Sequence, residues 1–75
     1  MEVKLFVSSN INGKIVEKRL KEVINDIGLH AHVEIHHQDP PTLNGFYYTP
    51  TLVVNDKVVS SGKVLSKQEM TNFFL

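Results

Sequence analysis

The chain opens on a pattern of apolar and polar positions that predicts a β-strand. Val3, Leu5 and Val7 alternate with charged residues, and apolar Phe6 stands between the last two of them. Such nearly continuous apolar character is typical of a strand that is covered on both faces. We therefore expect a central strand over residues 2–7.

Helical spacing follows after a polar stretch at residues 8–13. Apolar residues then recur every three or four positions, which predicts an amphipathic helix from about Gly13 to Ile27. Asn10 can cap the start of this helix, and Gly28 can end it in the left-handed conformation. The apolar positions that define the helix are Val16, Leu20, Val23, Ile24 and Ile27.

A second strict alternation covers residues 30–36 and predicts a half-exposed strand. Ala31, Val33 and Ile35 share one face of this strand. The other face carries His30, His32, Glu34 and His36. A strand, a helix and a second strand in this order predict a right-handed crossover that joins two parallel strands.

The second half of the chain predicts a hairpin and a final helix. Strands over residues 51–54 and 58–60 flank an Asn-Asp-Lys turn. Between Pro40 and Gly45 there is room for one or two helical turns at most. Ser66 and Glu69 form a capping box for the last helix, with Leu65 and Met70 as its hydrophobic staple. The residues of this helix that we expect to face the core are Met70, Phe73 and Phe74.

Length and composition limit the classes of function. Seventy-five residues support one domain, and eight basic residues balance eight acidic ones. Without a net charge we expect no nucleic-acid partner and no binding to an anionic membrane. The apolar run at the N-terminus is too short for a signal peptide or a membrane span. The chain contains no cysteine, which indicates a reducing compartment and predicts a cytoplasmic location.

The segment Tyr48-Thr49-Pro50-Thr51 and its continuation to Lys63 resemble the thioredoxin-like fold, and are most similar to the very small thioredoxin- or glutaredoxin-like redox proteins. The resemblance covers the whole chain as a single domain, 1–75. It implies an α/β fold with a four-stranded mixed sheet in the order β-α-β-(α)-β-β-α. It also implies a cis peptide bond between Thr49 and Pro50.

The redox motif of this family, two cysteines separated by two residues, maps onto residues 10–13. Asn10 and Gly13 occupy the two cysteine positions. A thiolate is the nucleophile of thiol–disulfide exchange, so disulfide oxidoreductase activity is excluded and we expect a protein without catalysis or cofactor. Asn10 keeps a capping role, whereas we expect Gly13 to supply only backbone freedom.

The resemblance further implies a binding surface around Pro50. In this family the residue before the proline pairs its backbone with an extended peptide or with glutathione. We expect a protein or peptide partner here, bound by a monomer or weak dimer; a glutathione-like ligand is the alternative. Ser61 and Gly62 can serve a ligand carboxylate or can simply form a turn. The candidate binding residues are Asn10, Gly13, Tyr48, Thr49, Pro50, Ser61 and Gly62.

A metal site on the histidine-rich strand is a second alternative. Imidazole and carboxylate groups bind zinc, nickel and copper, and the candidate ligands are His30, His32 and His36. Side chains on one face of a strand stand roughly 7 Å apart, so three of them do not easily reach one ion. The competing interpretation is a solvated polar face on an edge strand.

Overall fold

The four strands form one mixed sheet in the order β2-β1-β3-β4. The structure is a computed structural model that describes residues 1–8, 10–37 and 48–75. Within them the element order agrees with the sequence-based prediction, and the predicted short helix between Pro40 and Gly45 lies outside the described residues. The elements are β1 (Glu2–Phe6), α1 (Ile11–Asp26), β2 (His32–His36), β3 (Thr51–Val54), β4 (Lys57–Ser61) and α2 (Lys67–Phe74).

The strand β1 is central, as its apolar character predicts. It pairs with β2 in parallel and with β3 in antiparallel orientation, and β4 completes the hairpin with β3. Phe6 lies opposite both His36 and Thr51, and Thr51 also lies opposite Ser61. The segments that follow β1, β2 and β4 and the segment that precedes β3 therefore all leave the sheet at one end.

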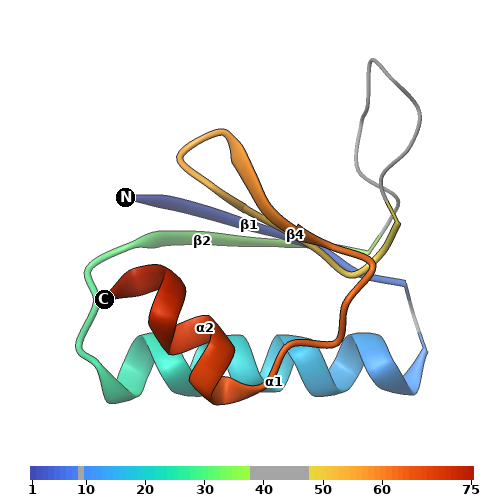
Figure 1. The fold of residues 1–75 in the computed structure, drawn as a ribbon, viewed down its shortest axis with the longest axis horizontal. Coiled ribbons are helices and arrows are strands. Elements are labelled where there is room, and N and C mark those ends of the chain that lie inside the picture. Colours follow the sequence, from blue (N-terminus) through green and yellow to red (C-terminus); the bar gives the residue numbers. More distant parts are fainter. Residues whose placement is uncertain (9, 38–47) are drawn as a thin grey trace.

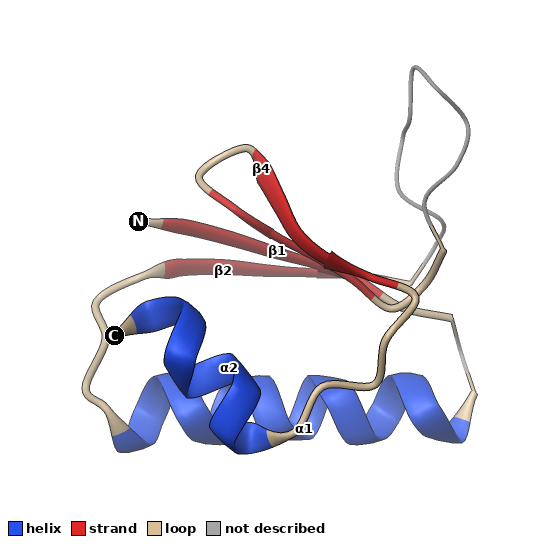
Figure 2. Ribbon diagram, viewed as in Figure 1, coloured by secondary structure: helices blue, strands red, loops and turns tan. Residues whose placement is uncertain are grey.

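Both helices lie on the same side of the sheet, as Figures 1 and 2 show. The core fills the space between them and the sheet, and it consists of aliphatic side chains and one methionine. Its buried residues are Val3, Leu5, Val7, Val16, Leu20, Val23, Leu52, Leu65 and Met70. No helix in the described part of the chain is long and apolar enough to cross a membrane.

The predicted helix signals are confirmed at both helices. The side-chain oxygen of Asn10 accepts a hydrogen bond of 2.8 Å from the amide of Gly13, which caps α1. Gly28, just after α1, has a φ of 65°, in the left-handed region that favours glycine. Ser66 and Glu69 form the complete capping box of α2.

The prediction for the core face of α2 is wrong at one residue. Met70 is buried and Phe74 packs against the core, whereas Phe73 is 39% exposed. Consecutive helical residues point about 100° apart, and the packing of this last turn directs Phe74 toward the core and Phe73 toward the solvent. The stripe runs through Met70 and Phe74, four residues apart, and leaves Phe73 at its side.

Candidate functional site

The candidate site lies at the end of the sheet where β1 ends and β3 begins. The loop Tyr48–Pro50 enters β3 there, and the segment after β1 leads into the N-terminus of α1 at the same end (Figure 1). The peptide bond between Thr49 and Pro50 is cis, as the resemblance implies. Phe46 and Tyr47, which precede this loop, lie outside the described residues.

A set of hydrogen bonds holds this loop against the end of β4. The amide of Gly62 donates to the carbonyls of Tyr48 and Pro50, at 2.7 and 2.9 Å. The hydroxyl of Ser61 accepts from the amide of Tyr48 at 2.9 Å. The buried hydroxyl of Thr51 donates to the carbonyl of Tyr48 at 2.7 Å. Both backbone groups of Tyr48 are therefore bonded within the protein.

These bonds favour the structural interpretation of Ser61 and Gly62. A carboxylate ligand would need a free donor, yet the amide of Gly62 already donates twice and the hydroxyl of Ser61 lies within the loop network. Gly62 also has a φ of 74°, a conformation that glycine adopts without strain. The two residues position the loop that precedes β3.

Thr49 differs from both of its neighbours. Among the described residues, no hydrogen bond uses the backbone amide or carbonyl of Thr49. The side chain of Tyr48 beside it is 70% exposed, and that of Ile11 in the first turn of α1 is 73% exposed. This end of the sheet thus combines large exposed apolar side chains with backbone groups to which no described residue bonds.

Gly13 allows the first turn of α1 to lie close to the segment that follows β1. A Cβ atom at this position would lie 2.2 Å from the carbonyl oxygen of Ser8 and 3.2 Å from the Cβ of Val7. The prediction that Gly13 supplies only backbone freedom is therefore wrong, because the first turn of α1 approaches the preceding segment too closely for any side chain. Close approach of this kind leaves no periodic signal in a sequence.

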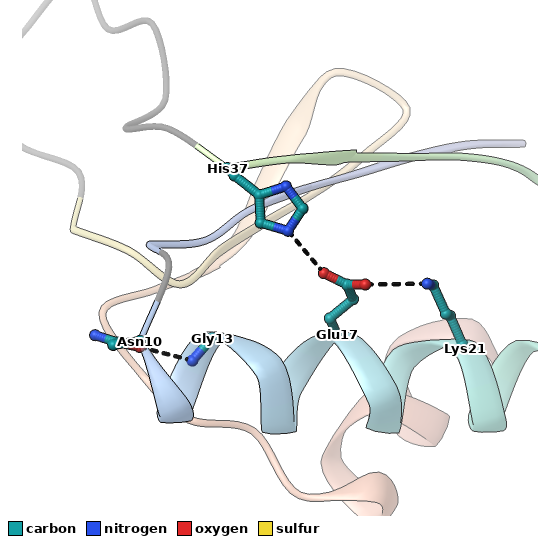
Figure 3. A network of polar contacts seen from close by, with 5 residues as sticks. All are labelled: Asn10, Gly13, Glu17, Lys21 and His37. Carbon is teal, nitrogen blue, oxygen red and sulfur yellow. Dashed lines mark hydrogen bonds and ion pairs between the residues drawn. The ribbon is translucent and has the colours of Figure 1, made fainter.

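A polar network joins α1 to the end of β2 (Figure 3). The carboxylate of Glu17 accepts from Lys21 at 3.0 Å, a pair that its spacing predicts, and also contacts the Nε2 of His37 at 3.0 Å. The hydrogen bond from Lys21 lowers the pKa of Glu17. Partial burial opposes this by raising the pKa, and the hydrogen bond with His37 lowers it further. Twenty positions separate Glu17 from His37, so no local pattern signals this contact.

We expect the Glu17 network to stabilise the fold weakly and only while its carboxylate is charged. The folded-state pKa lies below the ordinary value of 4.5, so the stabilisation is present above that pH and is lost as the pH falls through the folded pKa. Glu17→Gln should cost about 0.5–1 kcal/mol at pH 7, as surface pairs do, and a smaller amount near pH 3, which lies below the ordinary pKa of 4.5. Urea unfolding at both pH values measures the difference, and an equal cost at both would contradict this assignment.

The histidines do not gather into a metal site within the described residues, where no group of three or more histidine, aspartate or glutamate side chains is arranged so that it could hold a metal ion. Glu34 lies 3.7 Å from His32 and 3.5 Å from His36 on the face that the alternation predicts. His30 precedes β2 and instead lines a groove with the core-facing side chains of this strand. Of the three candidate metal ligands, only His32 and His36 therefore share one face of β2.

The comparisons with known proteins agree with this architecture. The family model described as a thioredoxin domain matches residues 1–75. No curated protein and no solved structure matches the chain. Because the chain has no cysteine, it lacks the thiolate on which thiol–disulfide exchange depends. With the family model matched over its whole length, the chain belongs to the thioredoxin domain family, as a member that has no redox cysteines.

Proposed function

We propose that this domain binds an extended segment of a partner protein at the loop that contains Thr49 and Pro50. The observation that carries the proposal is the contrast along this loop. The amide of Tyr48 and the carbonyls of Tyr48 and Pro50 are bonded to the end of β4, whereas the backbone of Thr49 has no partner among the described residues. An extended peptide supplies the matching amide and carbonyl.

The side chains around Thr49 suit such a ligand. Exposed aromatic side chains are typical anchors of protein interfaces, and the side chain of Tyr48 is 70% exposed. Ile11 presents an aliphatic side chain from the start of α1 at the same end of the sheet. Apolar side chains of the bound segment would pack against these two residues while its backbone pairs with Thr49.

The remaining candidate residues support this surface without contacting the ligand through their own polar groups. Asn10 caps α1 and fixes the helix start, and Gly13 permits its close approach to the preceding segment. Ser61 and Gly62 hold the loop in place. A glutathione-like ligand fits less well, because its carboxylate would find the amide of Gly62 already engaged. The absence of cysteine suits a binding domain in a reducing compartment such as the cytoplasm.

Selection from a library of random peptides, followed by titration of the selected peptides, tests this function. We expect Tyr48→Ala to raise the dissociation constant at least tenfold, which corresponds to about 1.4 kcal/mol, because it removes the aromatic anchor. The matched control is Leu75→Ala, a change at the C-terminal residue, which is 86% exposed and lies away from the loop (Figure 1). Glutathione is titrated in parallel.

Two outcomes would contradict the proposal. Peptides that bind the wild type and Tyr48→Ala with equal affinity would place the binding surface elsewhere. Glutathione binding that Tyr48→Ala abolishes, with no peptide selected, would favour the small-ligand alternative. A thermal denaturation curve of each variant shows that it remains folded, which the exposure of both side chains leads us to expect.

A further inference from the structure

The two edges of the sheet differ in how they are protected against pairing with another chain. A register irregularity between Leu52 and Val53 disrupts the pairing of β3 with β4, and β4 begins with the charged Lys57. Bulges and lysines are devices that discourage edge-to-edge association. The other edge strand, β2, has no lysine or proline and keeps a regular register with β1 along all five residues. Among the described residues, no other strand pairs with this edge.

The hydrogen bonds of β2 show which of its backbone groups face outward. The amide of His32 and the carbonyl of His36 bond to residues beside β1, at 2.9 and 2.8 Å. A parallel pair uses every second residue, so the even-numbered residues of β2 bond toward β1. The amides and carbonyls of Val33 and Ile35 therefore point to the open edge, where no described residue pairs with them.

An apolar groove runs along the same edge on the helix side. It has a volume of about 450 Å³ between the C-terminal half of α1 and β2, and Ile24, Leu29, Val33 and Ile35 contribute to its lining. Val33 and Ile35 are only half-buried although they belong to the core-facing side of the strand. A chain that pairs with the outward backbone of β2 would also cover these side chains.

We propose that the occupant of this edge is a second copy of the chain, paired through β2 in antiparallel orientation about a two-fold axis at Val33. In this register Val33 faces Val33 of the second copy, and the two exchange their outward amide and carbonyl groups. His32 then lies directly opposite Glu34 of the second copy, and the symmetry repeats this pair. The imidazole can donate to the carboxylate in both pairs.

The charge pattern of β2 selects this register over its neighbour. A two-fold axis shifted to Glu34 would place the two Glu34 carboxylates directly opposite each other, which is destabilising. In that second register the outward backbone groups of Val33 and Ile35 would still find hydrogen-bond partners. The charges therefore distinguish the two registers, and the backbone does not. The apolar side chains of both copies meet on the helix side and extend the two grooves into one covered surface.

The strand β2 is only five residues long, so the dimer should be weak. Stable complexes bury about 1,600 Å² in total, which is more than we expect from a short strand and one groove. We therefore expect a dissociation constant in the micromolar range or above. Sedimentation equilibrium from low micromolar to millimolar concentration measures it. A protein that stays monomeric over this whole range would overturn the proposal.

Variants on β2 identify the interface. Val33→Pro removes an amide that points away from β1. Edge strands tolerate proline at such positions, so the fold should remain while the dissociation constant of the dimer rises at least tenfold. Glu34→Lys should weaken it as well, and the added change His32→Glu should restore it by reversing the pair. The control Asn72→Lys, on the exposed side of α2, should leave it unchanged.

The charge reversal keeps the test decisive if Val33→Pro proves unstable, because His32 is exposed and Glu34 is half-exposed. Thermal denaturation of each variant monitors the fold. A dimer that Glu34→Lys leaves intact, or that the double variant fails to restore, would place the contact on another surface and refute this register.

Discussion

Gly13→Ala should destabilise the domain by about 2–3 kcal/mol, the upper part of the range for overpacked sites. The added methyl group would lie 2.2 Å from the carbonyl oxygen of Ser8, and a backbone atom cannot turn aside as the end of a long side chain can. The higher helix propensity of alanine, worth at most about 1 kcal/mol over glycine, only partly offsets this clash. Urea unfolding followed by circular dichroism measures the change.

The neighbouring position supplies the control. Asn12 lies in the same turn of α1 but is exposed, so Asn12→Ala should change the stability by less than about 0.5 kcal/mol. If Gly13→Ala were as stable as the wild type, the close approach of α1 to Ser8 would not exist in the protein. The comparison separates a local steric clash from a general response of this helix to alanine.

This contact bears on the lost redox motif. The resemblance places the second redox cysteine at Gly13, where the present backbone has no room for a Cβ atom. Asn10 is exposed, so a cysteine fits there without a clash. The departure from the family thus includes the space around the motif as well as its thiols, and two substitutions alone would not rebuild the site.

Met70→Ala should have the largest effect in α2, about 2–5 kcal/mol, because it empties a fully buried position. Met70 is the buried residue of this short helix, and without disulfides the domain relies on its core to hold α2 in place. A 75-residue domain has little stability to spare, so the variant should be largely unfolded near 37 °C.

Phe73→Ala is the matched test on the same helix. Its side chain is larger than that of Met70 but is 39% exposed, so the loss should be under about 1 kcal/mol. Thermal and urea unfolding of the two variants give the comparison. A larger loss for Phe73→Ala than for Met70→Ala would reverse our orientation of α2 against the sheet.

The sequence predicts most of the fold because its elements carry strong local signals. The alternation around β1, the helical spacing of α1 and the capping box at Ser66 each depend on residues a few positions apart. Such signals are not sufficient at Phe73. Helical periodicity alone allows either Phe73 or Phe74, or both, to face the core. Only the packing of α2 decides that Phe74 faces the core.

The candidate site is predicted less completely, since its contacts join distant parts of the chain. The motif around Pro50 indicates a binding loop, but not that Ser61 and Gly62 are engaged in holding it. The contact of Glu17 with His37 and the close approach of Gly13 to Ser8 depend on how the elements pack. These contacts follow from the tertiary structure and from no spacing along the sequence.

Hydrogen exchange at the amide of Thr49 tests the central claim most directly. We expect this amide to exchange rapidly in the free protein, because no described residue accepts a hydrogen bond from it, and to be protected at least tenfold when a selected peptide is bound. The amide of Gly62, which donates to Tyr48 and Pro50, should already be protected in the free protein. A peptide that binds without slowing exchange at Thr49 would contradict the proposed pairing at this loop.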